Sequence, residues 1–469
     1  MRLADTAMIT AVLDGLRPEL AAGTADRVSR VRAARLLTKL EHPLSPAQAD
    51  VLRMLVVDPA VDPIPVARAG WDMIAAAGRL PAADEAGAAA LEADDLALAL
   101  LTETSLANPP AEKALRGVRR WLLLSGRAGD FPRTTAAFIA QARRNGGAWP
   151  FDHEESARLS PAEPLADAYR PPRPIPKAAG AFGSPVVEAI AEHYEEWPYP
   201  VWERVMDPGD EDLASLLASL GPGAPTLPES PEILVAGCGG GRETMLIALR
   251  APEARITAID LSSASLAYAA ERCSRLNNVT FEQRDLHKVG ELGRTFDLIS
   301  CSGVIHHLPD PEAGWRTLVE VLKPGGVISV MVYSKLARMR VKAARKRIAD
   351  LLDRPIDGDL MREARARLLA DPPHPLVYAD DFASLGGLRD LLLHHHEDNF
   401  DVPRVRRGVE ALGLEFLGFN MPGSERRARY RAEHPHDPWF RDYDAWAAAE
   451  WREPDLFAGM YHFWCRKPV

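Results

Sequence analysis

The stretch Pro231–Asp260, PEILVAGCGGGRETMLIALRAPEARITAID, decides the fold of this chain. It opens on an apolar run at Ile233–Val235, which is typical of a buried strand. A glycine-rich turn, Gly237–Gly241, follows, and Arg242–Arg250 then carries apolar residues at helical spacing. A second apolar run, Ile256–Ile259, precedes the acid that closes the stretch. The order strand, glycine turn, helix and strand predicts an α/β fold with a parallel sheet.

The glycine turn and the closing acid indicate a ligand site. Glycine lets the backbone approach a ligand closely and reach positive φ, and the start of the following helix offers unpaired N–H groups. An acid about 20 residues past the glycines lies where it can bind the hydroxyls of a ribose. The spacing GxGGG over Gly237–Gly241 is one residue shorter than the usual dinucleotide fingerprint. The glycine pattern alone is weak evidence for any particular ligand, so the identity of the ligand must be inferred from the neighbouring segments.

Four segments between residues 231 and 333 resemble, in order, the motifs of class I S-adenosylmethionine (SAM) methyltransferases. Pro231–Asp260 resembles motif I. Phe281–Leu286 (FEQRDL) resembles the end of the third strand, and Phe296–Leu308 (FDLISCSGVIHHL) the fourth strand and its exit. Leu322–Tyr333 (LKPGGVISVMVY) resembles the turn into the fifth strand. The resemblance implies a seven-stranded Rossmann-like sheet, with Leu414–Phe419 and Met460–Lys467 as its antiparallel terminal pair.

The resemblance also implies a SAM site at the ends of the strands. Asp260 would hold the ribose, and Asp285 with Leu286 would hold the adenine. The same comparison implies backbone or side-chain contacts from Ala236, Gly237, Cys238, Gly239, Gly241, Leu261, Ser302 and Gly303. A simple strand-end cap is the alternative for each of the two acids.

One departure concerns the residues just before the glycine motif. Many members of the family carry an acid there, which orients the glycine loop or the amino group of the ligand. This chain has Val235 and Ala236 instead. We therefore expect the methionine end of SAM to be held differently here.

Composition limits the classes of protein to consider. The chain has 469 residues, 47% hydrophobic residues and 26% charged residues, which predicts two or three globular domains. A net charge of -10 argues against non-specific nucleic-acid binding. The four cysteines show no CxxC spacing, and no signal peptide or apolar run of about 18 residues is present. These features favour a cytoplasmic protein without a membrane segment.

Three regions are expected along the chain. Residues 1–155 are predicted to form an N-terminal all-α accessory domain, with helices at Thr24–Leu40, Pro46–Val57, Leu91–Leu106, Pro110–Ser125 and Arg133–Arg144. Such a bundle suits a protein partner or a homodimer. Residues 156–185 form a Pro-rich linker. Residues 186–469 form the SAM-binding domain, and a helical insertion at about 335–398, after the fifth strand, is expected to cap the site.

The C-terminal part narrows the resemblance to bacterial TPR-associated methyltransferases. Tyr199-Pro200 matches their aromatic corner, and Arg389–Leu392 (RDLL) precedes His394, Glu397 and Phe400 as it does in that group. No 34-residue period is visible in the N-terminal bundle. What the group methylates does not carry over to this chain.

The basic segment Lys335–Ile348 carries seven Lys or Arg residues and no acid. It is predicted to be helical, with Met339, Ala343 and Ile348 facing inward. A solvated helix face explains its charge, and a patch for an anionic substrate or for RNA is the alternative.

Three residues are candidates for the acceptor side of the reaction. His306 leaves the fourth strand where open α/β sheets bind ligands, so it is a candidate base, although a structural role is the alternative. Tyr199 belongs to an aromatic segment that either packs as a corner or lines the pocket. His394 falls on one helix face with Glu397, as an acceptor contact or a structural pair. No metal site is predicted.

The leading hypothesis is a methyltransferase that moves the sulfonium methyl of SAM to an O, N or C nucleophile and releases S-adenosylhomocysteine (SAH). The acceptor is a small molecule or a protein or peptide side chain. The cofactor supplies the chemistry and the protein supplies alignment, so a base is needed only where the acceptor must lose a proton. The alternatives are a non-catalytic SAM-binding protein and an NAD-dependent oxidoreductase, which would need the longer glycine spacing.

Overall fold

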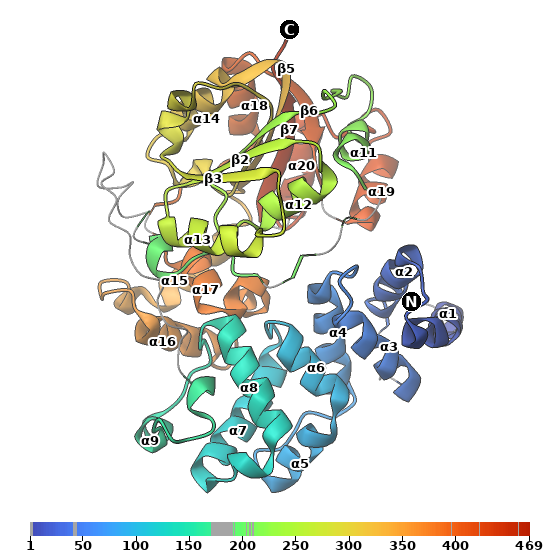
Figure 1. The fold of residues 1–469 in the computed structure, drawn as a ribbon, viewed down its shortest axis with the longest axis vertical. Coiled ribbons are helices and arrows are strands. Elements are labelled where there is room, and N and C mark those ends of the chain that lie inside the picture. Colours follow the sequence, from blue (N-terminus) through green and yellow to red (C-terminus); the bar gives the residue numbers. More distant parts are fainter. Residues whose placement is uncertain are drawn as a thin grey trace. The chain divides into compact units, whose positions relative to one another are not determined.

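The computed structural model describes residues 3–40, 45–169, 191, 193–202, 204–205, 208, 211–394, 396–421, 423–457 and 459–469. The chain forms two compact units (Figure 1). The first comprises Met1–Arg173, Arg204–Asp207 and Ala344–Leu393. The second comprises Pro174–Glu203, Pro208–Ala343 and His394–Val469. Most of the predicted Pro-rich linker lies outside the described residues, so the boundaries predicted for the three regions stay predictions.

A seven-stranded sheet forms the centre of the second unit, in the order β3-β2-β1-β4-β5-β7-β6. Its strands are β1 Glu232–Ala236, β2 Arg255–Asp260, β3 Val279–Gln283, β4 Phe296–Ser302, β5 Leu322–Tyr333, β6 Glu415–Phe419 and β7 Met460–Arg466. The first five strands pair in parallel, and β7 runs antiparallel to both β5 and β6. This topology confirms the predicted α/β class, including the antiparallel terminal pair.

Helices cover both faces of this sheet, which explains why its central strands are apolar throughout. Ile233 and Val235 on β1 pack on one face with α11 (Leu213–Ala218), α12 (Arg242–Arg250) and α13 (Ser263–Arg272). Leu234 and Ala236 face the other way, toward α14 (Pro311–Glu320), α18 (Val402–Ala411) and α20 (Tyr443–Arg452). Figure 1 shows the sheet between these two sets of helices. The unit also contains α19 (Ser424–Glu433).

The strand register brings the predicted site residues to one edge of the sheet. Ala236 pairs with Ile259, so the glycine turn and Asp260 leave neighbouring strands at the same level. Val235 pairs with Ser300, so β4 ends beside the same turn. Parallel strands that stop together in this way form the ligand-binding edge of open α/β sheets.

The first unit is a helical bundle around buried residues such as Trp71, Leu100 and Phe138. Its helices are α1 Leu3–Ala22, α2 Arg27–Leu37, α3 Pro46–Val56, α4 Pro63–Ala76, α5 Glu85–Ala93, α6 Asp95–Glu103, α7 Pro109–Ser125, α8 Pro132–Asn145 and α9 His153–Arg158, with α16 Gly358–Leu369 and α17 Leu385–Leu392 from the insertion. The single helix predicted at Leu91–Leu106 is wrong. Asp94 accepts a hydrogen bond from the Ala97 N–H at 3.0 Å and begins a separate helix there.

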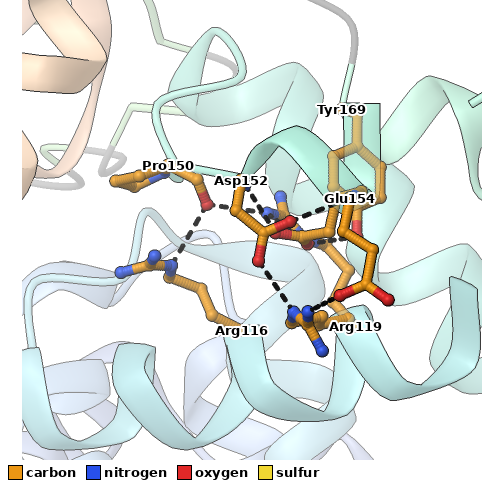
Figure 2. A network of polar contacts seen from close by, with 8 residues as sticks. Arg116, Arg119, Pro150, Asp152, Glu154 and Tyr169 are labelled. Atoms are coloured by element: carbon orange, nitrogen blue, oxygen red, sulfur yellow. Dashed lines mark hydrogen bonds and ion pairs between the residues drawn. The ribbon is translucent and has the colours of Figure 1, made fainter. Parts of the chain in front are cut away.

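A polar network fixes the chain that follows α8 onto α7 (Figure 2). The buried Arg119 guanidinium donates to the Pro150 carbonyl at 3.0 Å and to the Ala168 carbonyl at 3.3 Å. The Tyr169 hydroxyl donates to Glu155 at 2.8 Å, and Glu155 also lies 3.7 Å from Arg119. These bonds satisfy the carbonyls of a loop that has no regular partner strand or helix.

The insertion after β5 contributes to the first unit. Arg365 on α16 forms an ion pair with Glu112 on α7, and both side chains are at most 3% exposed. Arg365 also donates to the Phe382 carbonyl at 3.0 Å. Residues 344–393 therefore share a core with the N-terminal bundle. The capping role expected of the insertion stays a prediction.

The basic segment after β5 forms α15, Met339–Arg347. The buried side chains are Val341, Ala344 and Ile348. The prediction for Ile348 is confirmed, and the predictions for Met339 and Ala343 are wrong because both residues are exposed. Arg338 and Arg340 form ion pairs with Glu397 and Asp455, respectively. Across the described ranges, no helix has both the length and the apolar character needed to cross a bilayer.

Candidate active site

The glycine turn after β1 accepts only glycine at several positions. Gly237, Gly239 and Gly241 have φ values of 69°, 50° and 80°. A Cβ atom on Gly237 would lie 2.3 Å from Cγ2 of Val304, and one on Gly241 would lie 2.7 Å from Cβ of Ala269. The turn is therefore held closely against its neighbours, with its backbone presented at the carboxyl edge of the sheet.

Asp260 closes the glycine loop. Its Oδ2 accepts a hydrogen bond from the Gly239 N–H at 2.8 Å, and its Oδ1 accepts one from the Ser262 N–H at 2.9 Å. Burial raises the pKa of Asp260 above its usual range. The carboxylate caps its strand end, but two oxygens with about four acceptor positions leave room for further donors such as ribose hydroxyls. The capping and ribose-binding predictions are thus compatible.

The geometry of Asp260 accounts for part of the missing acid before the glycines. Val235 and Ala236 are 2% and 0% exposed and pack in the two faces of the sheet. The Gly239 N–H is bound from β2, so the loop is oriented without an acid on β1. The backbone of Cys238 is fixed as well, because its N–H donates to the Ile259 carbonyl at 2.9 Å.

The aromatic segment that contains Tyr199 lies on the glycine loop. The Tyr199 carbonyl accepts from the Gly240 N–H at 3.1 Å, and the Trp202 indole N–H donates to the Gly240 carbonyl at 2.6 Å. Tyr268 on α13 accepts from the Trp202 N–H at 3.0 Å. The structure therefore brings Tyr199 to the predicted cofactor loop through its backbone. The contacts of Trp202 and Tyr268 were not predicted.

Glu195 is a second residue that the sequence analysis did not single out. Its carboxylate accepts from the Ser263 N–H at 2.5 Å and from the Ala264 N–H at 3.2 Å, at the start of α13. A carboxylate at a helix N-terminus is favoured by the orphan N–H groups and the helix dipole. Its negative charge contributes to the raised pKa of Asp260 after the larger effect of burial.

Asp285 and Leu286 lie at the end of β3, beside the Asp260 strand. Gln283 pairs with Asp260 in the register and donates to the Leu261 carbonyl at 2.8 Å. Asp285 begins the short helix Leu286–Leu292 and accepts from the His287 N–H at 2.9 Å. Its hydrogen bond with the His287 side chain holds the pKa of Asp285 below its usual value. The carboxylate is thus ionised and locally anchored at the predicted adenine position.

The end of β4 supplies Ser302 and Gly303. Gly303 has a φ of 76°, and its N–H donates to the Met331 carbonyl at 3.1 Å. The Ser302 hydroxyl is buried and has no hydrogen-bond partner within the part of the chain that the structure describes. Both residues therefore lie at the strand edge shared with the glycine loop and Asp260, and their cofactor contacts stay predictions.

Aromatic rings gather just beyond the end of β4, around the helix Ile305–His307. The His306 ring lies 4.2 Å from His307 and 4.1 Å from Tyr333, and the His307 ring stacks on His394 at 3.6 Å, centroid to centroid. Burial lowers the pKa of His306 well below its usual value and that of His307 to about 4. The rings are therefore neutral at pH 7, and His306 is 0% exposed. This environment opposes proton uptake by His306 and supports the packing alternative. The prediction that His394 shares a helix face with Glu397 is wrong, because α17 ends at Leu392 and both residues lie beyond it outside any helix.

Comparisons with known proteins identify relatives of this chain. A family model described as a methyltransferase domain matches residues 234–328. A trans-aconitate 2-methyltransferase from Afipia carboxidovorans is 30% identical over 223 residues, which cover 47% of this chain and 80% of that protein. A Synechococcus sp. protein described as uncharacterized is 33% identical over 262 residues, or 51% of this chain. The chain spans 61% of that Synechococcus protein's length, under two thirds of it.

Among solved structures, PKMT2 from Rickettsia typhi in complex with AdoHcy shares 16% identity over 54% of this chain and 52% of its own, with a TM-score of 0.39. The matched family model spans β1 to β5, and the Afipia relative is covered over most of its length. Together with the order and direction of the strands, these matches show that the chain belongs to the class I SAM-dependent methyltransferases.

Proposed function

We propose that the protein transfers the sulfonium methyl of SAM to an O, N or C nucleophile of a small molecule or of a protein or peptide side chain. The observation that carries this proposal is the closed loop formed by Gly239 and Asp260 at the carboxyl edge of the sheet. It combines a backbone that a ligand can approach with a partly buried acid beside it, the combination that holds an adenosine.

We propose the following contacts for SAM. Asp260 binds the ribose hydroxyls, Asp285 and Leu286 hold the adenine, and the glycine backbone lies against the sugar and the methionine chain. The remaining contacts in this proposal are Ala236, Cys238, Leu261, Ser302 and Gly303. Their common position at the ends of β1, β2, β3 and β4 supports the assignment.

On the acceptor side, the proposal is catalysis by alignment. Holding two reactants in line contributes about 7–11 kcal/mol in well-oriented systems, so an enzyme of this class needs no strong base. The neutral, buried rings of His306 and His307 support such a mechanism. Tyr199 and His394 are then positioning contacts for the acceptor, because the first lies on the glycine loop and the second stacks on His307.

A methyl-transfer assay tests this function. Purified protein is incubated with methyl-labelled SAM and extract from cells that lack the protein, and small molecules and proteins are separated before counting. We expect label in one fraction, and small carboxylic acids such as trans-aconitate are the first pure acceptors to try because a relative bears that name. Asp260→Asn serves as the binding-deficient control. Absence of labelled product with every fraction contradicts the proposal.

The alternative function is a SAM-binding protein without turnover. Calorimetric titration with SAM and SAH separates the two, because a non-catalytic binder binds both and still transfers no label. A comparison of thermal shifts with NAD and SAM tests the oxidoreductase reading. A protein partner or homodimer through the N-terminal bundle, and a cytoplasmic location, stay predictions.

A further inference from the structure

The second carboxylate at the glycine loop belongs to Glu243, in the first turn of α12. The Ser300 hydroxyl on β4 donates a hydrogen bond to it. Ser300 is 1% exposed, and Glu243 is partly buried. The bond therefore holds the glutamate side chain down onto the sheet instead of leaving it in solvent.

The position of Ser300 is informative because it is the register partner of Val235. Val235 and Leu298 pack on the face of the sheet that α12 covers, and Ser300 faces the same way because it is two residues from Leu298. The Glu243 carboxylate therefore extends from α12 to Ser300, which is the neighbour of Val235 in the sheet. Val235 is one of the two residues that replace the acid found in many family members.

The charge of Glu243 has no basic partner among the residues that the structure describes, since no lysine or arginine there forms an ion pair with this carboxylate. The loop-orienting task of the missing acid is already performed by Asp260, which binds the Gly239 N–H. Buried charges are normally paired. We therefore expect the partly buried Glu243 carboxylate to pair with a cationic group of the ligand.

We propose that Glu243 binds the α-ammonium group of the methionine moiety of SAM, with Ser300 as the residue that positions it. This inference rests on the proposed function and names the group that holds the end of the cofactor opposite the adenine. In many family members a single acid at the end of β1 orients the glycine loop or binds the amino group of the ligand. In this chain Asp260 orients the loop, and Glu243 binds the ammonium group.

The test compares two ligands that differ in the amino-acid part. SAH carries the ammonium group, whereas 5′-deoxy-5′-methylthioadenosine keeps the adenosine and thioether and lacks it. Binding of both is measured by calorimetry for wild type and Glu243→Gln. We expect Glu243→Gln to lower the affinity for SAH at least about tenfold, because one charge-assisted hydrogen bond is lost. The affinity for methylthioadenosine should stay within about twofold of the wild-type value. Ser300→Ala should weaken SAH less, by about threefold, in the same selective manner.

Glu320→Gln is the matched control, because Glu320 is exposed at the far end of α14. It should change neither ligand. Equal losses for both ligands in Glu243→Gln, or an unchanged SAH affinity, overturn the inference and leave the proposed function intact. If wild type binds neither ligand, the proposed function itself fails. Should Glu243→Gln not fold, Glu243→Asp carries the same comparison, since a shortened carboxylate must also lose SAH selectively.

Discussion

At the scale of single residues, two side chains have environments that decide their ionisation. Asp260 carries its charge in a buried place that raises its pKa, and two backbone N–H groups offset that cost. His307 is buried, and this burial lowers its pKa to about 4. Burial therefore disfavours the charged form of both residues, and the backbone N–H groups favour the ionised form of Asp260.

Asp260→Asn should weaken SAH binding at least about tenfold, because a neutral amide replaces the charged acceptor of the ribose hydroxyls. Calorimetric titration measures the change. Asparagine keeps one oxygen for the Gly239 N–H, so the loop is expected to persist. Asp310→Asn is the control, since Asp310 also begins a helix but lies at α14. Equal SAH affinity in Asp260→Asn and wild type would show that the ribose is bound elsewhere.

The free energy of unfolding should fall as the pH is lowered from about 6.5 to about 4. In this window the unfolded chain takes up a proton on His307, near its ordinary pKa of about 6.5, and the folded protein does not. Each such histidine contributes a slope of up to about 1.4 kcal/mol per pH unit, with its full stabilisation present above pH 6.5.

His307→Asn should reduce that slope by the share of one histidine, measured by urea denaturation at pH 7.0 and 5.5. His462, whose pKa burial also lowers to about 4, stays in both proteins and provides the internal reference. An identical pH dependence in the variant and in wild type would contradict the assignment to His307.

At the scale of elements, the glycine loop and the aromatic segment form one assembly. Gly240 is the contact point, because the Tyr199 carbonyl and the Trp202 indole bind its N–H and C=O groups. The loop itself was predictable from spacing, because the glycines and Asp260 are local to one βαβ unit. The attachment of Trp202 and Tyr268 was not, since it joins residues 66 positions apart that no local pattern relates.

Gly240→Ala should displace the aromatic segment and weaken SAH binding. Gly240 has no positive φ, so the substitution adds no backbone strain, but a Cβ atom would lie 2.1 Å from the Pro200 carbonyl oxygen. The expected loss is about tenfold in affinity, with cleavage near residue 200 by a protease of low specificity as the structural readout. Gly290→Ala is the control, because its Cβ atom would meet nothing within 4 Å. Identical affinity and cleavage in both variants would separate the segment from the site.

At the scale of the whole molecule, the seven-stranded sheet with its antiparallel terminal pair followed from the resemblance to a known family, and the helical character of the N-terminal region followed from apolar periodicity. The helix break at Asp94 and the exposure of Met339 could not be predicted from periodicity. A helix cap and a small rotation of a helix both leave the spacing of apolar residues almost unchanged. The membership of residues 344–393 in the first unit was also unpredictable. It depends on the Arg365–Glu112 pair, which joins positions 253 residues apart.

Glu112→Gln should lower the free energy of unfolding of the first unit by about 3–5 kcal/mol, because it leaves the buried Arg365 charge without its partner. Urea denaturation of the full chain, followed by circular dichroism, measures the loss. Glu363→Gln is the control, since this residue forms ion pairs with Arg354 and Arg367 that are exposed to solvent and contribute little to stability. Similar stability of the two variants would contradict a shared core of α7 and α16.

The split composition of the first unit has a consequence for synthesis on the ribosome. Glu112 leaves the exit tunnel long before Arg365 has been translated, so the emerging N-terminal helices carry this acid without its ion-pair partner for the time it takes to add 253 residues. The bundle can close around that acid once the insertion arrives. A nascent chain stalled before residue 344 should therefore bind chaperones and be cleaved by proteases more readily than one stalled after residue 393 has emerged.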